Sequence, residues 1–425
     1  MLLPNLNNHK IKTLVATSNK YATPFFILDE VELNKRCEQL KNSFYKRYPK
    51  THVFYAYKAN CIPHLLHTIH SHGFGAEVSS GLELQLATKL NVKNTVFNGP
   101  GKTNAELTYA LKKKAMIVVD NLDELKKILS LQTPSLKIAL RLSPPYLKNK
   151  EWSRFGLQRN HLDSALGLIN KNDVCLEGVH FHLGSELTDS TKHSKAIKWL
   201  STLIKSTLHD FKDEISFVDV GGGFGVHGSA KKTLMAHSLR MVDKFTGSKN
   251  LEGLACTSPK KVEDIDGFAE NICAAFTSEI VPQLGEIELW IEPGRWIINP
   301  CIHMISSVVA VKNKSAVLDV GINNLPNCIY EQYPCINLTR PSDEKKKISL
   351  FGPLCMSNDK ISTTLQGDLP REGDKVCVCN VGAYNIPWSS QFIQPLAKVV
   401  ASNEKTSKII RVEEGLDYRI GRDNI

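Results

Sequence analysis

The chain has 425 residues, an ordinary globular composition and a formal net charge of +10, a length that predicts two domains with room for a third. It holds no run of 18 or more apolar residues, and its N-terminal stretch lacks the apolar core of a secretion signal. We therefore expect no membrane span and a cytoplasmic protein. The positive charges form no large basic block, which favours small anionic ligands and argues against nucleic acid as a partner.

The cysteines also fit a cytoplasmic protein. The 11 cysteines are scattered without a framework, so we expect reduced thiols rather than disulfides. Cys377 and Cys379 are spaced like a half metal site, but the sequence offers no second ligand pair. We predict that both pack in a core and that the chain has no metal site.

From residue 53 to residue 292, short apolar strands alternate with helix-like stretches. Eight such units predict parallel strands closed into a (β/α)8 TIM barrel, with an open doubly wound sheet as the alternative. The predicted strands are Val53–Tyr57, Gly75–Val78, Thr95–Phe97, Met116–Val119, Lys137–Leu142, Leu176–His182, Ile215–Val220 and Ile287–Ile291.

The carboxyl ends of these strands carry reactive or backbone-exposing residues. A barrel gathers these ends on one face, where active sites lie. We therefore expect groups from distant parts of the chain to meet there. The strand ends deliver Lys58, Glu77, Asn98, Asp120, Arg141, His182, Gly221 and Glu292.

The barrel rhythm stops twice. Residues 227–266 lack a clear strand, and we expect an irregular loop and a helix over the active face. After Glu292, strand follows strand with Pro and Gly turns between them, which predicts a mainly β domain. We assign residues 24–292 to the barrel, and residues 1–23 with 293–425 to the β domain. The predicted β strands are Ile302–Val311, Ala316–Val320, Lys347–Phe351, Lys375–Val381 and Ala397–Ala401.

Lys58 ends a buried strand, where an ammonium group loses hydration. Desolvation lowers the pKa of a lysine, and a neutral amine can attack a carbonyl. The alternative is a lysine whose stem lies along the strand while its ammonium reaches water.

Glycine-rich turns accompany this lysine. VDVGGGFG at 218–225 follows a strand and can wrap an anion with backbone N–H groups, although its spacing is not that of a dinucleotide site. EPGR at 292–295 adds a carboxylate and an arginine, and HFHLGS at 180–185 adds histidines and a small polar turn. Two histidines on one strand face could bind metal, but no third ligand is suggested nearby. A lysine, a carboxylate and several anion-binding turns fit pyridoxal 5′-phosphate.

With these motifs the chain resembles the fold-type III pyridoxal-phosphate decarboxylases, the group that includes the diaminopimelate, ornithine and arginine enzymes. The resemblance spans about residues 24–395. It implies an eight-stranded barrel of the alanine-racemase type, a β domain, and a homodimer with shared active sites. The matching stretches are YAYKAN (55–60), AEVSSGLEL (76–84), RFGL (154–157), HFHLGS, VDVGGGFG, EPGR, GPLCMSND (352–359) and VGAYNIPWSSQFIQP (381–395).

The resemblance implies catalytic roles for four residues. Lys58 matches the lysine that binds the cofactor covalently, and Glu292 the carboxylate on the pyridine nitrogen. His182 matches a histidine stacked on the ring. Cys355 matches a cysteine that the partner subunit contributes to protonate the α-carbon. The implied cofactor contacts are Lys58, Glu77, Arg141, His182, Ser185, Gly222, Gly223, Glu292, Gly294, Arg295 and Tyr384.

The motifs depart from the diaminopimelate enzymes at the substrate side. Met356 stands where they carry an acid for the distal amine, and the loop 321–330 lacks their arginine for the distal carboxylate. We place Met356, Asn327 and Glu331 on the substrate side, with Glu331 as a possible replacement acid. The favoured substrate is a substituted or conjugated amino acid of a siderophore or antibiotic pathway, free or on a carrier protein.

The alternatives stay open. The first is diaminopimelate decarboxylase of lysine biosynthesis. Less favoured are an ornithine or lysine decarboxylase, an amino-acid racemase, and a non-catalytic homologue that binds the cofactor.

Overall fold

The computed structural model describes residues 6, 8–131, 133–145, 154–226, 230–231 and 261–421. The chain divides into two compact units. The barrel unit comprises Lys35–Gly225 and Val262–Trp296, and the β unit comprises Met1–Asn34, Val226–Lys261 and Ile297–Ile425. Most of the loop and helix predicted at 227–266 lies outside the described residues.

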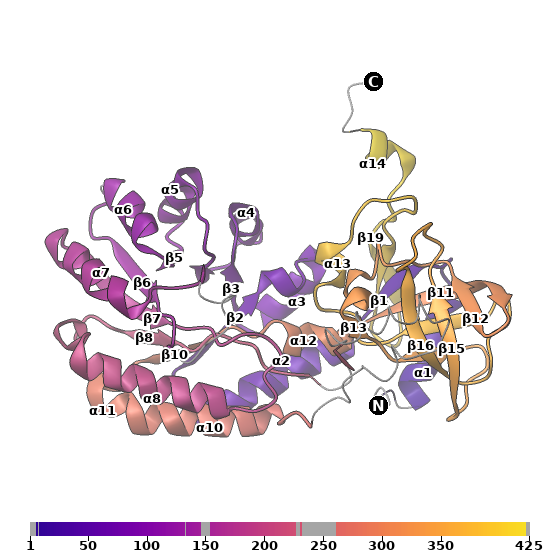
Figure 1. The fold of residues 1–425 in the computed structure, drawn as a ribbon, viewed down its shortest axis with the longest axis horizontal. Coiled ribbons are helices and arrows are strands. Elements are labelled where there is room, and N and C mark those ends of the chain that lie inside the picture. Colours follow the sequence, from indigo (N-terminus) through magenta and orange to yellow (C-terminus); the bar gives the residue numbers. More distant parts are fainter. Residues whose placement is uncertain are drawn as a thin grey trace, which may run out of the picture. The chain divides into compact units, whose positions relative to one another are not determined.

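The barrel unit contains a closed ring of parallel strands (Figure 1). The ring closes where the last strand pairs with the first, with Leu289 opposite Thr51. This confirms the predicted (β/α)8 barrel and excludes the open sheet. The strands are β2 (Thr51–Ala56), β3 (Gly75–Val78), β4 (Thr95–Phe97), β5 (Met116–Val119), β6 (Lys137–Arg141), β7 (Cys175–His180), β8 (Phe217–Asp219) and β10 (Glu288–Ile291).

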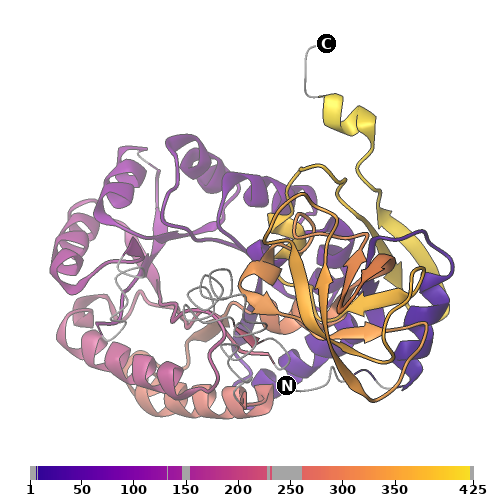
Figure 2. The ribbon, with the colours of Figure 1, turned by 45° about the vertical axis from the view of Figure 1, so that its right-hand side comes forward.

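Helices surround these strands (Figure 2). Several start where the sequence supplies a capping side chain: Ser80 accepts from Glu83 N, and Thr103 forms a reciprocal capping box with Glu106. The helices are α2 (Glu30–Tyr45), α3 (Pro63–Ser71), α4 (Gly81–Lys89), α5 (Asn104–Lys112), α6 (Leu122–Ser130), α7 (Arg159–Lys171), α8 (Thr191–Ser206), α10 (Ile265–Glu279) and α11 (Val281–Leu284).

Aromatic packing fills part of the barrel interior. The rings of Phe217 and Trp290 stack with centroids 3.5 Å apart and planes 7° apart. Phe54 and Val96 belong to the same buried cluster. A Cβ on Gly178 would lie 2.2 Å from the Phe217 ring, so the stack requires glycine at that position.

The β unit is built on a nine-stranded sheet of order β12-β15-β16-β14-β17-β11-β1-β18-β19. A two-stranded pair, β13 (Glu331–Gln332) with β9 (Ala230–Lys231), lies apart from it in the topology. The sheet strands are β1 (Phe25–Asp29), β11 (Ile302–Lys312), β12 (Ser315–Leu318), β14 (Cys335–Asn337), β15 (Lys345–Phe351), β16 (Lys360–Gln366), β17 (Lys375–Val378), β18 (Lys398–Ser402) and β19 (Ser407–Arg411). The helices of this unit are α1 (Asn8–Ser18), α13 (Asn385–Trp388) and α14 (Leu416–Ile420), and α12 (Arg295–Ile298) spans the boundary between the two units.

Strand β1 falls inside the range 24–292 predicted for the barrel, yet it pairs within the sheet of the β unit. It runs antiparallel to β11 and parallel to β18, with Ile27 opposite His303 and Val400. Its apolar run is almost wholly buried because it has a strand on each side and α1, through Leu14, packs against the same cluster. This corrects the start of the predicted barrel range.

Among the helices that the structure describes, none is long and apolar enough to cross a membrane.

Candidate active site

Lys58 lies in a single 3-10 turn, Tyr57–Ala59, directly after β2. Its Nζ is 2.6 Å from Glu77 Oε2; the lysine side chain is 39% exposed, and the glutamate is fully buried. Glu77 is the next-to-last residue of the neighbouring strand β3 and also accepts a hydrogen bond from the Ser79 hydroxyl at 2.9 Å. The lysine is therefore anchored by a buried carboxylate rather than extended freely into water.

A second carboxyl group accompanies this pair. Glu83 accepts a hydrogen bond from Ser79 N at 2.7 Å. Burial raises the pKa of Glu83 to about 7; the Ser79 bond opposes this rise, and the nearby Glu77 charge adds to it. Glu83 was not predicted as a site residue, although it lies within the AEVSSGLEL motif.

Glu292 follows β10 and is almost fully buried. The Asn98 amide donates to its Oε1, and His180 Nε2 lies 3.4 Å from its Oε2. Burial opposes its ionisation, but the contact with His180 and the charge of Lys58 outweigh burial and lower the pKa of Glu292. The site therefore holds a buried carboxylate that is ionised at neutral pH.

His182 stays neutral. Gly222 N–H donates to its Nδ1 at 3.3 Å, which places the proton of the neutral ring on Nε2. Burial, followed by the charge of Lys58, lowers the pKa of His182 well below its usual value. A neutral, flat ring suits the predicted stacking role.

Arg141 ends β6 and is buried. Its Nη1 lies 3.4 Å from Asp120 Oδ1, and its guanidinium carbon lies 4.7 Å from the centroid of the Phe155 ring. The ion pair joins two of the strand ends that the sequence predicted to meet.

The glycine turn after β8 is held by close backbone packing. Gly221 and Gly223 have φ of 70° and 85°. A Cβ on Gly222 would lie 2.0 Å from the Glu292 carbonyl oxygen, and one on Gly223 would lie 2.1 Å from the Gly184 carbonyl oxygen. Only glycine fits, because three strand ends bring their backbones together here.

The EPGR turn packs beside the lysine. Ala56 N donates to Pro293 O at 3.2 Å, and a Cβ on Gly294 would lie 2.9 Å from Ala59 Cβ. Arg295 Nη1 forms a 3.3 Å ion pair with Glu186, and both side chains are largely buried. Ser185, the neighbour of Glu186, is exposed.

These residues fit pyridoxal 5′-phosphate. An amine for the aldehyde is anchored beside a buried carboxylate, and an ionised buried carboxylate is available for a protonated ring nitrogen. A glycine turn without Cβ atoms packs against the backbone of Glu292, and Arg295 follows in the same EPGR turn as Glu292. The donor set matches what this cofactor requires.

The remaining predicted residues lie in the β unit. Cys355 and Met356 are exposed, and Tyr384 has a left-handed backbone, with φ of 64°, at the start of α13. Asn327 donates to Ala383 O, and both it and Glu331 are buried. The predicted place of Asn327 and Glu331 on the substrate side stays a prediction.

The loop 321–330 is tied down by side-chain amides. Asn323 and Asn324 donate to the backbone oxygens of Gln394 and Pro395 at 3.1 and 3.0 Å. Asp359 accepts from Ile322 N, at the start of the loop, at 2.8 Å. The asparagines in this loop therefore serve the fold of the β unit.

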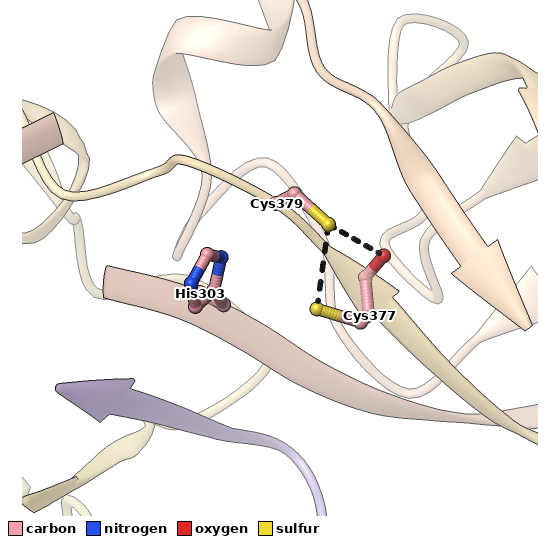
Figure 3. A group of neighbouring side chains, drawn as sticks. All are labelled: His303, Cys377 and Cys379. Carbon is pink, nitrogen blue, oxygen red and sulfur yellow. Dashed lines mark hydrogen bonds between the residues drawn. The ribbon is translucent and has the colours of Figure 1, made fainter. Parts of the chain in front are cut away.

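A His–Cys–Cys group also lies in the β unit (Figure 3). Cys377 Sγ is 3.6 Å from Cys379 Sγ, and one ligand atom from each of these and His303 lies within 4.8 Å of the others. However, Asn380 N–H donates to His303 Nδ1 at 3.1 Å, which leaves the proton of the neutral ring on Nε2. Neither ring nitrogen then offers a free lone pair. Both thiols belong to an apolar cluster with Phe25, which agrees with the predicted core packing.

Several residues of the site escaped the sequence analysis. Asn98 was predicted at a strand end without a role, and His180 was considered only as a metal ligand. Asp219 lies in the VDVGGGFG motif but was not singled out. The feature that could have identified Asp219 is an acidic residue in an otherwise apolar, buried strand.

Comparison with known proteins shows the family to which the chain belongs. A family model described as pyridoxal-dependent decarboxylase, pyridoxal binding domain, matches residues 31–299. A diaminopimelate decarboxylase of Aquifex aeolicus is 26% identical, with 96% of this chain and 93% of the relative covered. One from Helicobacter pylori (strain J99) is 28% identical, with 93% and 94% covered.

Solved structures share the fold. Diaminopimelate decarboxylase from M. jannaschii in co-complex with L-lysine has a TM-score of 0.82 and 24% identity, covering 97% of this chain and 94% of that one. A lysine/ornithine decarboxylase from Vibrio vulnificus complexed with cadaverine has a TM-score of 0.76 and 23% identity, covering 94% and 98%.

Proposed function

Because the chain belongs to the pyridoxal-dependent decarboxylase family, we propose that it releases CO2 from the α-carbon of a diamino acid, with meso-diaminopimelate as the first candidate. The chain is a PLP-dependent carboxy-lyase. The observation that carries the proposal is one barrel end that holds both Lys58, paired with buried Glu77, and an ionised, buried Glu292.

Each residue of this end has a proposed task. Lys58 holds the cofactor covalently, and Glu292 keeps the proton on the ring nitrogen. Gly222, Gly223, Ser185 and Arg295 bind the phosphate. Bound pyridoxal phosphate supplies an electron sink for the pair released as CO2 leaves. The buried surroundings of Glu292 strengthen its charge interaction, because water does not screen it.

The relatives support the first candidate substrate. Those in Aquifex aeolicus and Helicobacter pylori are diaminopimelate decarboxylases, and each alignment covers more than nine-tenths of both chains. Lysine biosynthesis is then the proposed pathway.

A second candidate follows from two local departures. Met356 is 42% exposed in the GPLCMSND turn, where it offers an apolar thioether rather than a carboxylate. The loop 321–330 contains no cation, and its asparagines bind backbone oxygens of the β unit. An acylated or conjugated distal nitrogen would avoid an unpaired ammonium at Met356. This candidate is a siderophore-type or antibiotic-type substrate, free or on a carrier protein.

We also propose a homodimer with shared active sites. Residues 381–395 of the β unit contain the GAY motif and are called the GAY segment below. This segment exposes three large apolar side chains, Trp388, Phe392 and Ile393. Such a group on one segment is typical of an interaction surface. Cys355 of the partner subunit is the proposed proton donor to the α-carbon. Tyr384 lies in the same GAY segment, and we propose that it contacts the phosphate.

The deciding experiment measures CO2 release from meso-diaminopimelate, ornithine, lysine, arginine and N-acylated diamino acids. The first candidate predicts that meso-diaminopimelate has the highest kcat/KM. Met356→Glu is the matched test: it restores a carboxylate, so it should favour free diamino acids over acylated ones. A clear preference for an acylated substrate in the wild type would establish the second candidate. No CO2 from any of them would count against both.

A further inference from the structure

His180, Asp219 and Glu292 form a buried acid–base cluster at one end of the barrel. Each is at most 3% exposed, and one oxygen or nitrogen from each lies within 4.8 Å of the others. His180 and Asp219 are register partners on β7 and β8, and β8 pairs with β10, which Glu292 follows. The barrel register therefore fixes the cluster.

The hydrogen bonds within the cluster are unequal. Glu292 receives the Asn98 amide on Oε1 and faces His180 Nε2 with Oε2. Asp219 Oδ1 accepts Gly221 N–H at 2.8 Å, but its Oδ2 is buried without a hydrogen-bond partner among the described residues. His180 Nδ1 is buried without one as well.

An unpartnered carboxylate oxygen in a buried site is costly when the group is ionised. When the group is protonated, the same oxygen carries an O–H and becomes a donor. The acceptor that the cluster offers this O–H is the Glu292 carboxylate, one oxygen of which lies within 4.8 Å of an Asp219 carboxylate oxygen. An unpartnered Oδ2 with an acceptor nearby is therefore the arrangement expected of a protonated Asp219.

The surrounding charges favour the same distribution. The ionisable groups that face the cluster are Lys58, Arg141, His182 and Glu77. Burial raises the pKa of Asp219 well above its usual value, and the Glu292 charge raises it further. Two carboxylates this close in a buried site do not both ionise readily, so one negative charge remains on the partner with more hydrogen-bond donors, which is Glu292.

We propose that Asp219 is a positioning residue that carries a proton at neutral pH and donates it within this cluster, leaving the single negative charge on Glu292. The functional part of this inference rests on the role proposed for Glu292 at the ring nitrogen. A neutral Asp219 holds the cluster together without a second negative charge, so Glu292 keeps both its charge and its place.

Infrared difference spectroscopy of the holoenzyme tests where the proton is. Asp219→Asn keeps an acceptor for Gly221 and an N–H donor where the O–H lies. Wild type minus D219N, at neutral pH, should show the C=O stretch of a protonated carboxylic acid, shifted in D2O. Glu83 is a second buried carboxyl group with a raised pKa, so it can give a carboxylic-acid band of its own. The control variant Glu83→Gln identifies that band. The Glu83 band should remain in the spectrum of D219N, whereas the Asp219 band should be lost. A difference spectrum with only carboxylate bands would overturn the proposal.

Thermal unfolding provides an independent readout. In the unfolded chain Asp219 ionises with a pKa of about 3.9. A carboxyl group that stays protonated in the folded state therefore lowers stability progressively as the pH rises above that value. The Tm of D219N minus that of the wild type should grow between about pH 5 and about pH 8. A Tm difference that does not change over this range would contradict a protonated Asp219.

Cofactor affinity tests the positioning role. D219N should bind pyridoxal phosphate within about threefold of the wild type, whereas Asp219→Ala, which loses both hydrogen bonds, should bind at least about tenfold more weakly. Equal affinity in D219A and the wild type would overturn the positioning role. If D219N does not fold, D219A still removes the carboxyl group for the infrared test. Should Glu292→Gln keep full activity, the proposed function would fail, while the infrared result would stand.

Discussion

Lys58 and Lys102 both lie between a strand of the barrel and the helix that follows it, but their surroundings differ. Lys102 Nζ donates to Gly99 O, Val118 O and Glu124 Oε1 at 2.7–2.9 Å, and its side chain is 1% exposed. Burial lowers the pKa of Lys102, yet its amine is enclosed by three acceptors. Lys58 has a side chain that is 39% exposed. The exposure of the side chain therefore distinguishes Lys58, which a cofactor can reach, from Lys102, whose amine is enclosed.

The two lysines therefore make a matched pair for labelling. Borohydride reduction of the holoenzyme followed by peptide mapping should place the cofactor on Lys58 and leave Lys102 unmodified. Lys58→Ala should lose at least about a hundredfold in turnover, because no other amine replaces the covalent anchor. A label on Lys102, or on any other lysine, would refute the assignment of Lys58.

At the scale of elements, the site depends on how closely strand ends approach one another. The glycine turn after β8 brings Gly222 against the backbone of Glu292, with no room for a methyl group. Gly167, in α7, has nothing within 4 Å of its Cβ position. The two positions separate crowding from the general effect of adding a methyl group.

We expect Gly222→Ala to destabilise the protein by about 1–3 kcal/mol, because backbone atoms must move apart. It should also weaken cofactor binding, because Gly222 N–H donates to His182. Gly167→Ala should instead stabilise α7 by up to about 1 kcal/mol, through the higher helix propensity of alanine. Urea unfolding and cofactor titration measure both effects. Similar behaviour of the two variants would show that the turn is not crowded.

At the scale of the whole molecule, the alternation of apolar strands and helices was enough to predict the barrel. The bounds of the predicted and observed barrel strands differ by two residues or fewer at each end. They agree because polar residues mark the points where the apolar runs end. The run FFILD was missed because five apolar or acidic residues do not distinguish a strand from a helix start. It becomes a strand only through its two neighbours in the sheet.

The site was predictable only in part, for a related reason. Lys58, Glu77 and Glu292 could be predicted because each lies at or just beyond the carboxyl-terminal part of a strand. Asp219 and His180 are neighbours only through the register of β7 and β8, which no motif displays. The hydrogen bond from the Asn327 amide to Ala383 O could not be read from the sequence either, and the place of Asn327 on the substrate side stays a prediction.

The last prediction concerns assembly. If the partner subunit supplies Cys355 to the site of Lys58, neither Lys58→Ala nor Cys355→Ala homodimers have a complete site. A hybrid dimer has one complete site, so random exchange should restore up to about a quarter of wild-type activity. The control mixes Lys58→Ala with the double variant Lys58→Ala/Cys355→Ala, which can form no complete site and should restore nothing. If subunit exchange is demonstrated and the test mixture still recovers no activity, Cys355 does not act in the neighbour's site.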